Sequence, residues 1–296
     1  MIALSGLAIT FPQTELVRTV PYSGEATARA DFPFEHPGPW TPDQVDDRLY
    51  SPFGGTMLTA SSRKIGGFAD PLLSVVMPVL DERATIEEIV GRVVAVPVRI
   101  ELIIVDDYST DGTREVLKDL QSLHQLRLIL QERQQGKGAA LRRGFEEVSG
   151  DIVVIQDADL EYSPEEYPDL ISLICQNRAD VVYGSRFLGR HRVFLFTHYL
   201  GNRFLTLITN VLYNTMLSDM ETCYKVMRTD VLRSFSLHSN GFGIEAELTA
   251  KIFKRGYRVY EIPISYDGRG YEAGKKVSWR DGVVALWVLI KYRFAE

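Results

Sequence analysis

Residues 153–161 read VVIQDADLE, so a run of β-forming residues ends at two carboxylates, Asp157 and Asp159, separated by one small residue. Buried strands are built from short apolar runs of this kind. A parallel sheet binds its ligand just beyond the carboxyl ends of its strands. The stretch therefore predicts a central buried strand with both acids at the mouth of a sheet.

Two carboxylates at this spacing can turn toward one hard cation once the chain leaves the strand at Ala158. Mg²⁺ and Mn²⁺ favour oxygen ligands, and proteins usually hold them with one or two carboxylates plus phosphate oxygens of a substrate. An isolated Asp-X-Asp triplet is more often a solvated turn with two acids. The metal hypothesis therefore depends on what the rest of the chain places around it.

Composition limits the classes of function. The 296-residue chain is 45% hydrophobic, enough for one large α/β domain or two small ones. Its net charge of −6 argues against a nucleic-acid binder, so any phosphate must be bound locally.

Cys175 and Cys223 have no metal-ligand spacing and are typical of reduced thiols in a cytosolic protein. The N-terminus lacks the pattern of a secretory signal. The longest apolar run, 282–290, is far shorter than the roughly 20 residues that span a bilayer. We expect a soluble or peripheral protein.

The chain divides into two regions. Residues 1–70 contain scattered Pro, Gly, Ser and Thr without a sustained period, which predicts a poorly ordered N-terminal extension. A start codon chosen too far upstream would give the same composition. Residues 71–296 are expected to form the compact domain.

Within 71–296, apolar strand-like runs alternate with helical patterns, and a capping box at 85–88 opens the first helix. This alternation predicts an α/β fold with a mostly parallel nucleotide-binding sheet flanked by helices. The expected strands are 72–79, 100–105, 127–131, a run from 151, 180–183 and 257–264. The expected helices are 85–94, 114–123, 139–148, one that opens at 163, 199–216, 244–255 and 279–294.

Two of these helices are amphipathic. The pattern of 199–216 favours a helix that covers the core over one that contacts lipid. Segment 279–294 is rich in aromatic residues, with Arg280, Lys291 and Arg293 flanking its apolar part. This C-terminal amphipathic helix could pack on the domain or lie at a membrane surface.

Polar groups recur in the loops that follow the strands, where an α/β sheet binds ligands. Each has a simpler alternative: Asp106 and Asp107 could cap the next helix, and 136–138 could be only a turn. Four polar groups would fall at the same sheet edge by chance much less often than a single one would. The groups are the segment 78–82, Asp106 with Asp107, Asp157 with Asp159, and the Gly-rich basic loop 266–276.

On these motifs, segment 72–294 resembles the family-2 inverting glycosyltransferases, in particular the dolichyl-phosphate mannose synthase branch. The stretches that carry the resemblance are 76–82 (VMPVLDE), 105–109 (VDDYS), 111–113 (DGT), 156–159 (QDAD) and 184–186 (GSR). Segments 219–225 (DMETCYK) and 269–275 look like that branch's acceptor-side and phosphate-clamping motifs. Leu80 and Asp81 stand where the branch usually has Tyr-Asn, and Glu161 where it often has Gln. These departures concern the sugar and the base rather than the fold.

The resemblance implies a GT-A fold that binds a nucleotide-diphosphate sugar, with Mg²⁺ or Mn²⁺ on the diphosphate. It implies catalytic roles for Asp157, Asp159 and Arg269, the first two as metal ligands. Arg186, Arg269 and Lys275 would contact phosphates, and Asp219 and Glu245 would lie on the acceptor side. The remaining nucleotide-sugar contacts would come from Pro78, Leu80, Glu82, Asp106 or Asp107, and Ala158.

The acceptor decides whether a general base is needed. A polyprenyl phosphate is already an oxyanion near neutral pH, so none of the five histidines is required as a base. A hydroxyl acceptor would need a base within hydrogen-bond reach, and Asp219, Glu245 and Glu247 are the candidates. The alternative for the two glutamates is a solvated helix face.

The leading hypothesis is a metal-dependent inverting transferase that moves a hexose, mannose from GDP-mannose first, to dolichyl or undecaprenyl phosphate. It would work as a cytoplasmic protein, peripheral at the membrane face, with a membrane-embedded subunit as an optional partner. One alternative is a family-2 transferase with a hydroxyl acceptor in polysaccharide synthesis. The other is a non-catalytic nucleotide-sugar-binding subunit.

Overall fold

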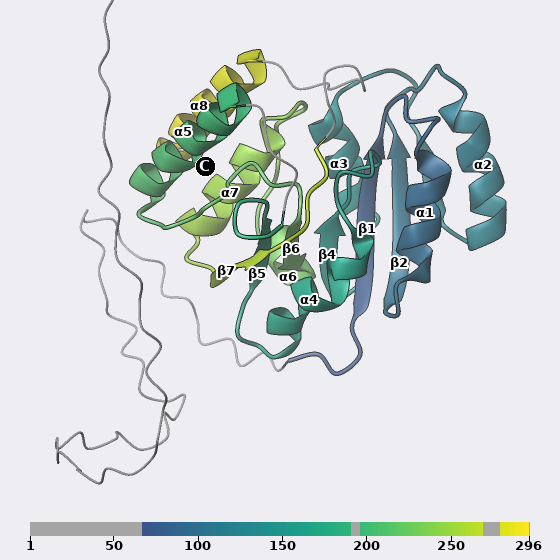
Figure 1. Cartoon of the computed structure of the whole chain (residues 1–296), viewed down its shortest axis with the longest axis horizontal. Helices are drawn as coiled ribbons and strands as arrows, with labels where there is room; N and C mark the ends of the chain where they lie inside the picture. Colours follow the sequence, from purple (N-terminus) through teal and green to yellow (C-terminus); the bar gives the residue numbers. More distant parts are fainter. Residues whose placement is uncertain (1–66, 191–195, 269–278, 296) are drawn as a thin grey trace, which may run out of the picture. The chain divides into compact units, whose positions relative to one another are not determined.

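The computed structural model describes residues 67–190, 196–268 and 279–295 (Figure 1). Most of the predicted N-terminal extension, together with Arg269 and Lys275, lies outside the described residues. The prediction for these positions stays a prediction.

The described part of the chain contains a seven-stranded sheet in the order β3-β2-β1-β4-β6-β5-β7. All neighbouring strands are parallel except β6, which runs antiparallel to both β4 and β5. The predicted mostly parallel sheet is confirmed, whereas β6 has no counterpart among the predicted strands. The strands are β1 Leu72–Val79, β2 Arg99–Asp106, β3 Arg127–Leu130, β4 Ile152–Ile155, β5 Val181–Ser185, β6 Lys225–Arg228 and β7 Val259–Pro263.

The central strands bring their carboxyl ends to one edge. Val79 of β1 pairs with Asp106 of β2, and Val76 of β1 pairs with Ile155, the last residue of β4. All four residues of β4 are buried, as expected for a strand covered on both faces. The loops after β1, β2 and β4 therefore leave the sheet side by side.

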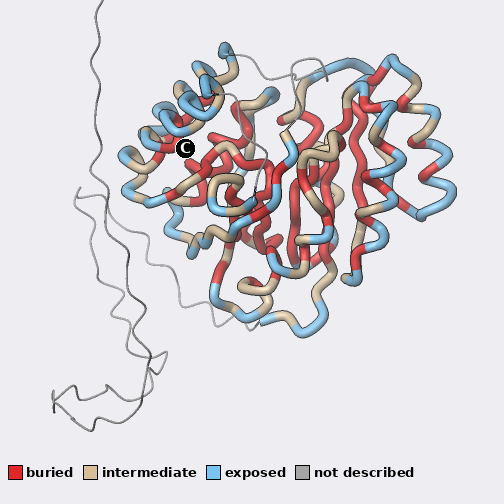
Figure 2. Tube along the Cα trace, viewed as in Figure 1, coloured by how far each residue is buried: buried red, intermediate tan, exposed pale blue. Residues whose placement is uncertain are grey.

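Helices cover both faces of the sheet. Successive strand side chains point to opposite faces, so the apolar strands present side chains to a helix layer on each face. Gly144 of α3 lies against Val76 and Val105, while Val75 and Met77 belong to the other face. Figure 2 shows the buried strands inside a more exposed shell of helices. The helices are α1 Ile86–Ala95, α2 Thr113–His124, α3 Lys137–Phe145, the short 3-10 helix η2 Pro164–Glu166, α4 Tyr167–Cys175, α5 Phe196–Tyr213, α6 Thr229–Arg233, α7 Ile244–Lys254 and α8 Trp279–Phe294.

Helices α5, α7 and α8 pack against one another (Figure 1), and α7 also contacts β5 through the Tyr183 and Thr249 hydroxyls. The Tyr213 hydroxyl donates a hydrogen bond to the Leu289 carbonyl at 2.7 Å, which joins α5 to α8. Only Leu205, Thr206 and Thr209 of α5 are buried, so α5 covers the core with a narrow strip. None of the described helices is both long and apolar enough to cross a membrane.

Gly144 tests the packing of α3 on the sheet. A Cβ at this position would lie 2.5 Å from Val76 Cγ1 and 3.2 Å from Val105 Cγ2. We expect Gly144→Ala to lower the free energy of unfolding by about 1–3 kcal/mol, because a well-packed interface cannot absorb the methyl group. Denaturant titration measures the change.

Gly91 in α1 is the matched control, since a Cβ there would have no atom within 4 Å. Gly91→Ala should be neutral or stabilising by about 0.5–1 kcal/mol. Equal effects of the two substitutions would contradict the close contact of α3 with β1 and β2.

Candidate active site

The loops after β1 and β2 form one hydrogen-bonded unit. The Asp81 N–H donates to Ser109 Oγ at 2.9 Å, and the Thr110 N–H donates back to Asp81 Oδ1 at 2.8 Å. The Glu82 N–H donates to Thr113 Oγ1 at 3.0 Å. The predicted nucleoside-binding segment 78–82 is thereby fixed to the loop that follows Asp106.

Asp106 and Asp107 hold backbone rather than cap the next helix. The fully buried Asp106 carboxylate accepts hydrogen bonds from the Tyr108 and Ser109 N–H groups and from the Arg114 guanidinium. Asp107 Oδ1 and Oδ2 accept from the Gln135 and Gly136 N–H groups, each at 2.7 Å. Gly112 caps α2, so the capping alternative is wrong for both acids.

Thr85 links the β1 loop to the paired carboxylates. Its hydroxyl donates to the Ala158 carbonyl at 2.8 Å, between Asp157 and Asp159. Thr85 does stand at the N-cap of α1, but its side chain makes no capping hydrogen bond. The predicted capping box is therefore wrong, because the hydroxyl is used to position the β4 loop.

Lys137 is the partner of Asp157. Its Nζ lies 2.8 Å from Asp157 Oδ1 and 3.2 Å from Glu245 Oε1. Burial alone would lower the pKa of Lys137, but Asp157, Cys223 and Glu245 outweigh it and hold the pKa well above its usual value. Segment 136–138 is thus more than a turn, and the lysine between its two glycines was the signal in the sequence.

The chemistry of the donor set decides whether a divalent ion fits at Asp157 and Asp159. Both follow β4 directly and offer only hard carboxylate oxygens, which suit Mg²⁺ or Mn²⁺. The described residues include no group of three or more acidic, His or Cys side chains that could hold an ion alone. The arrangement therefore fits an ion that completes its shell with oxygens of a bound substrate.

Arg186, predicted to contact phosphate, forms a two-pronged ion pair with Asp219. Arg186 Nε lies 2.7 Å from Asp219 Oδ2, and Arg186 Nη2 lies 2.7 Å from Asp219 Oδ1. Burial opposes the charge, but Asp219 keeps the pKa of Arg186 well above its usual value. Arg203 of α5 shares a neighbour with Arg186: both guanidinium groups lie about 6 Å from the Phe187 ring centroid, and Arg203 Nη1 donates to the carbonyl of Ser218, next to Asp219.

Glu245 and Glu247 are both buried, so the solvated-face alternative is wrong for both. Glu245 Oε2 lies 3.1 Å from Lys225 Nζ, a fully buried ammonium in β6. Glu247 is bound by Lys251 at 2.7 Å and by the N–H groups of residues 238 and 239. Glu247 therefore has a structural role, whereas Glu245 belongs to the charged cluster around Lys137.

Lys225 is fully buried, and the Glu221 carboxyl has one buried oxygen, Oε1; both residues lie in the predicted acceptor-side segment 219–225, of which only Asp219 had been given a role of its own. Lys225 also donates to the carbonyls of Met220 and Thr222, on either side of Glu221. Burial raises the pKa of Glu221 to about 7, and Glu245 adds to the rise while Lys225 opposes it. The resemblance of segment 219–225, which ends at Lys225, was the signal in the sequence for this cluster.

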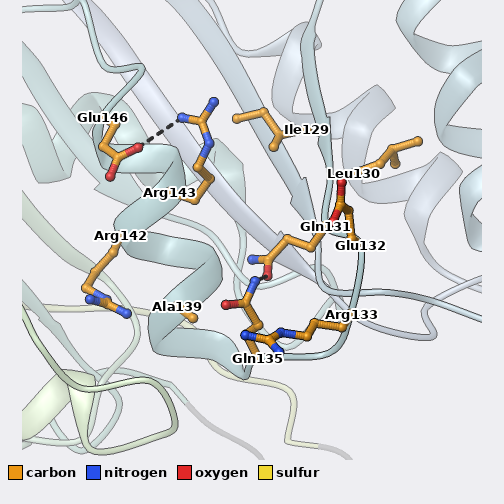
Figure 3. Close-up of a pocket in the computed structure, with 10 residues that line it drawn as sticks. All are labelled: Ile129, Leu130, Gln131, Glu132, Arg133, Gln135, Ala139, Arg142, Arg143 and Glu146. Carbon is orange, nitrogen blue, oxygen red and sulfur yellow. Dashed lines mark hydrogen bonds and ion pairs between the residues drawn. The ribbon is translucent and has the colours of Figure 1, made fainter.

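A cavity of about 570 Å³ lies between β3 and α3 (Figure 3). Its wall includes Gln131 and Gln135, and Gln135 also donates to Asp107. Figure 3 shows Arg143 bonded to Glu146 along this wall. The cavity thus adjoins the outer end of the predicted nucleoside site and not the paired carboxylates.

Similar solved structures share the fold. The glucosyl-3-phosphoglycerate synthase of Mycobacterium tuberculosis, in complex with Mn²⁺, UDP and glucosyl-3-phosphoglycerate, matches with a TM-score of 0.60 at 22% identity. The match covers 76% of this chain and 81% of that chain. The same synthase with Mg²⁺ and UDP matches with a TM-score of 0.59. The predicted GT-A fold is confirmed.

Curated relatives are similar in sequence. A dolichol-phosphate mannosyltransferase of Pyrococcus furiosus is 30% identical over 200 residues, which are 66% of this chain and 56% of the relative. The low-salt glycan biosynthesis hexosyltransferase Agl6 of Haloferax volcanii is 30% identical over 218 residues, covering 72% of this chain and 51% of the relative. The chain thus spans about half the length of these relatives.

An undecaprenyl-phosphate 4-deoxy-4-formamido-L-arabinose transferase of Aeromonas hydrophila is 38% identical over 111 residues, 36% of this chain and 34% of the relative. The model of glycosyl transferase family 2 matches residues 74–235, more than half of the chain. The chain therefore belongs to glycosyl transferase family 2.

Proposed function

We propose that this chain is a metal-dependent inverting glycosyltransferase that moves a hexose from a nucleotide sugar to a polyprenyl phosphate. The observation that carries the proposal is that Arg203, on the exposed apolar face of α5, contacts the same Phe187 ring as Arg186. Mannose from GDP-mannose is the first candidate donor, because a dolichol-phosphate mannosyltransferase is among the relatives.

The donor diphosphate is assigned to the loop after β4. Asp157 and Asp159 would hold Mg²⁺ or Mn²⁺, which neutralises the negative charge that develops on the departing nucleotide diphosphate. Arg269 and Lys275 are predicted to add positive charge there. The nucleoside would contact the unit formed by residues 78–82 and the loop behind Asp106 and Asp107.

Lys137 has a clear task beside this site. Its ammonium bonds both Asp157 and Glu245 and so joins the β4 loop to α7. The lysine fixes the direction of the Asp157 side chain before any donor binds. It therefore contributes preorganisation rather than a proton.

The acceptor phosphate is assigned to Arg186 and Arg203. The Arg203 side chain is on exposed α5, and neighbouring Phe204 and Leu207 are 51% and 57% exposed. A phosphate bound by the arginines would place an attached apolar chain along α5. Since the phosphate is already an oxyanion, attack on the sugar from the side opposite the leaving group needs no strong base and inverts the anomeric centre.

The apolar faces of α5 and α8 fit a peripheral position on a membrane. Val211 of α5 is 72% exposed, and Trp279 and Trp287 of α8 are 77% and 64% exposed. Tryptophans on one side of an amphipathic helix are typical of the interface between water and lipid. Because the two helices pack together, they would reach the bilayer surface where a lipid-linked phosphate lies.

The proposed reaction is tested by product formation. Purified protein is incubated with Mg²⁺ or Mn²⁺, a short-chain polyprenyl phosphate, and GDP-mannose, UDP-glucose or UDP-N-acetylglucosamine in separate reactions. We expect a glycolipid from one donor, lost on chelation. Nucleotide release with a hydroxyl acceptor but not with the lipid would instead support the polysaccharide alternative.

Asp159→Ala tests the catalytic assignment. Loss of a metal-binding carboxylate should lower kcat/KM by on the order of 10²-fold or more. Asp169→Ala, at an exposed position of α4, is the matched control and should leave turnover unchanged. Unchanged turnover of Asp159→Ala would favour the non-catalytic subunit instead.

Leu207→Glu and Trp287→Glu test the membrane face. Each places a charge on an exposed apolar position, so binding to anionic phospholipid vesicles should fall by roughly 10-fold or more in a sedimentation assay. Leu123→Glu is the control, because Leu123 is 73% exposed on α2, outside the α5 and α8 pair. Equal binding of all three variants and wild type would rule out this face as the membrane contact.

A further inference from the structure

We propose that Glu221 is a specificity-determining residue that accepts a hydrogen bond from a ring hydroxyl of the transferred sugar. This inference rests on the proposed function, since it assumes a nucleotide-sugar donor. It gives a role to a carboxyl whose Oε1 atom is buried and that neither the metal site nor the phosphate site uses.

The segment that carries Glu221 is fixed in place. The Met220 N–H donates to Thr206 Oγ1 at 3.1 Å, and the Thr222 hydroxyl donates to the Gly184 carbonyl at 2.6 Å. The Cys223 N–H donates to the Tyr162 hydroxyl at 3.0 Å. Glu221 is therefore presented from a backbone that is anchored on both sides, as a selective contact requires.

One oxygen of the Glu221 carboxyl has no hydrogen-bond partner among the described residues. Its Oε1 is buried, and no described residue donates a hydrogen bond to it. Buried polar atoms nearly always have a partner in native proteins, so each exception calls for a ligand or another explanation. An acceptor oxygen that lies on a fixed segment and still lacks a partner is suited to accept a hydrogen bond from a bound molecule.

The neighbours of Glu221 are linked to both proposed phosphate sites. On one side, Lys225 bonds the carbonyls that flank Glu221 and also bonds Glu245, which Lys137 connects to Asp157. On the other side, Asp219 pairs with Arg186. The sugar must lie between the donor diphosphate and the acceptor phosphate, because it passes from one to the other.

The acceptor oxygen of Glu221 selects the kind of group it can bind. With or without its proton, a carboxyl group keeps an oxygen that accepts a hydrogen bond from a neutral hydroxyl. A site built to bond a hydroxyl rejects the analogue that lacks it far more strongly than an apolar pocket would. Glu221 would therefore distinguish hexoses that differ at one hydroxyl.

Binding measurements test the assignment without requiring turnover. The full chain and Glu221→Ala are titrated with GDP-mannose, UDP-glucose and UDP-N-acetylglucosamine, and with GDP and UDP. We expect the variant to lose roughly 10-fold or more in affinity for the bound nucleotide sugar and less than about 2-fold for the bare diphosphate. Equal losses for both, or no loss, would overturn the role of Glu221.

Deoxy analogues of the bound donor identify the hydroxyl. One analogue should bind wild type and Glu221→Ala equally, because the contact is already missing. If every deoxy analogue still distinguishes the two proteins, Glu221 does not bond a ring hydroxyl. If wild type binds none of the donors or diphosphates, the proposed function fails as well, which is a separate result.

Glu221→Gln separates recognition from general-base catalysis. Glutamine keeps an acceptor oxygen, so affinity and kcat should stay within roughly 10-fold of wild type. A loss of 10²-fold to 10⁴-fold in kcat with binding retained would show a base instead and overturn the proposal. Glu166→Gln is the matched control, because Glu166 Oε2 is also buried without a hydrogen-bond partner among the described residues. It should not alter the preference among sugars.

Thermal unfolding shows whether the variant protein is intact. Burial raises the pKa of Glu221 from 4.5 to about 7, with Glu245 and Asp219 raising it and Lys225 and Arg186 lowering it. The folded protein then keeps this proton up to about pH 7 while the unfolded chain releases it near 4.5, so stability falls across that window. Glu221→Gln should therefore raise Tm by several degrees at pH 8 and change it little at pH 4.5.

Discussion

The ammonium of Lys137, bound between Asp157 and Glu245, is the interaction on which the rest of the site depends. A cation between two nearby carboxylates offsets their mutual repulsion. Lys137 supplies that cation from the first position of α3, and Gly138 allows the start of this helix to approach the backbone of Ser239. One side chain thereby joins the β4 loop, α3 and α7, and orients Asp157.

The parallel register makes this convergence possible, and internal carboxylates fix it. Loops after β1, β2 and β4 leave one edge of the sheet, and their backbone N–H groups need acceptors outside the hydrogen-bond ladder of the strands. Asp81, Asp106 and Asp107 provide these acceptors from within the loops themselves. The acidic motifs thus also hold the backbone around the proposed donor site in place. Arg114 offsets the negative charge of Asp106, with which it forms an ion pair.

Local sequence patterns predicted the scaffold well and the contacts poorly. The first strand and the last helix have the predicted bounds, because a continuous apolar run and a long amphipathic repeat are local signals. Strand β6 was missed because it begins with Lys225 and follows a polar segment. The Arg186–Asp219 and Lys137–Glu245 pairs join residues far apart in the sequence, which no local period encodes. Arg269 and Lys275 lie outside the described residues, so their roles remain proposals.

The pairing of Arg186 with Asp219 has a consequence for acceptor binding. An isolated guanidinium in a partly buried site would be costly, and the carboxylate removes that cost while it fixes the direction of the arginine. An acceptor phosphate must then share Arg186 with Asp219 or draw on Arg203, which is exposed on α5. Because Arg203 lies beside the apolar residues of the α5 face, it would bind best an anion whose attached apolar chain can lie along that face. Under the proposed function, a lipid phosphate would bind better than a free phosphate, because burial of its chain along α5 would add to the contact with Arg203.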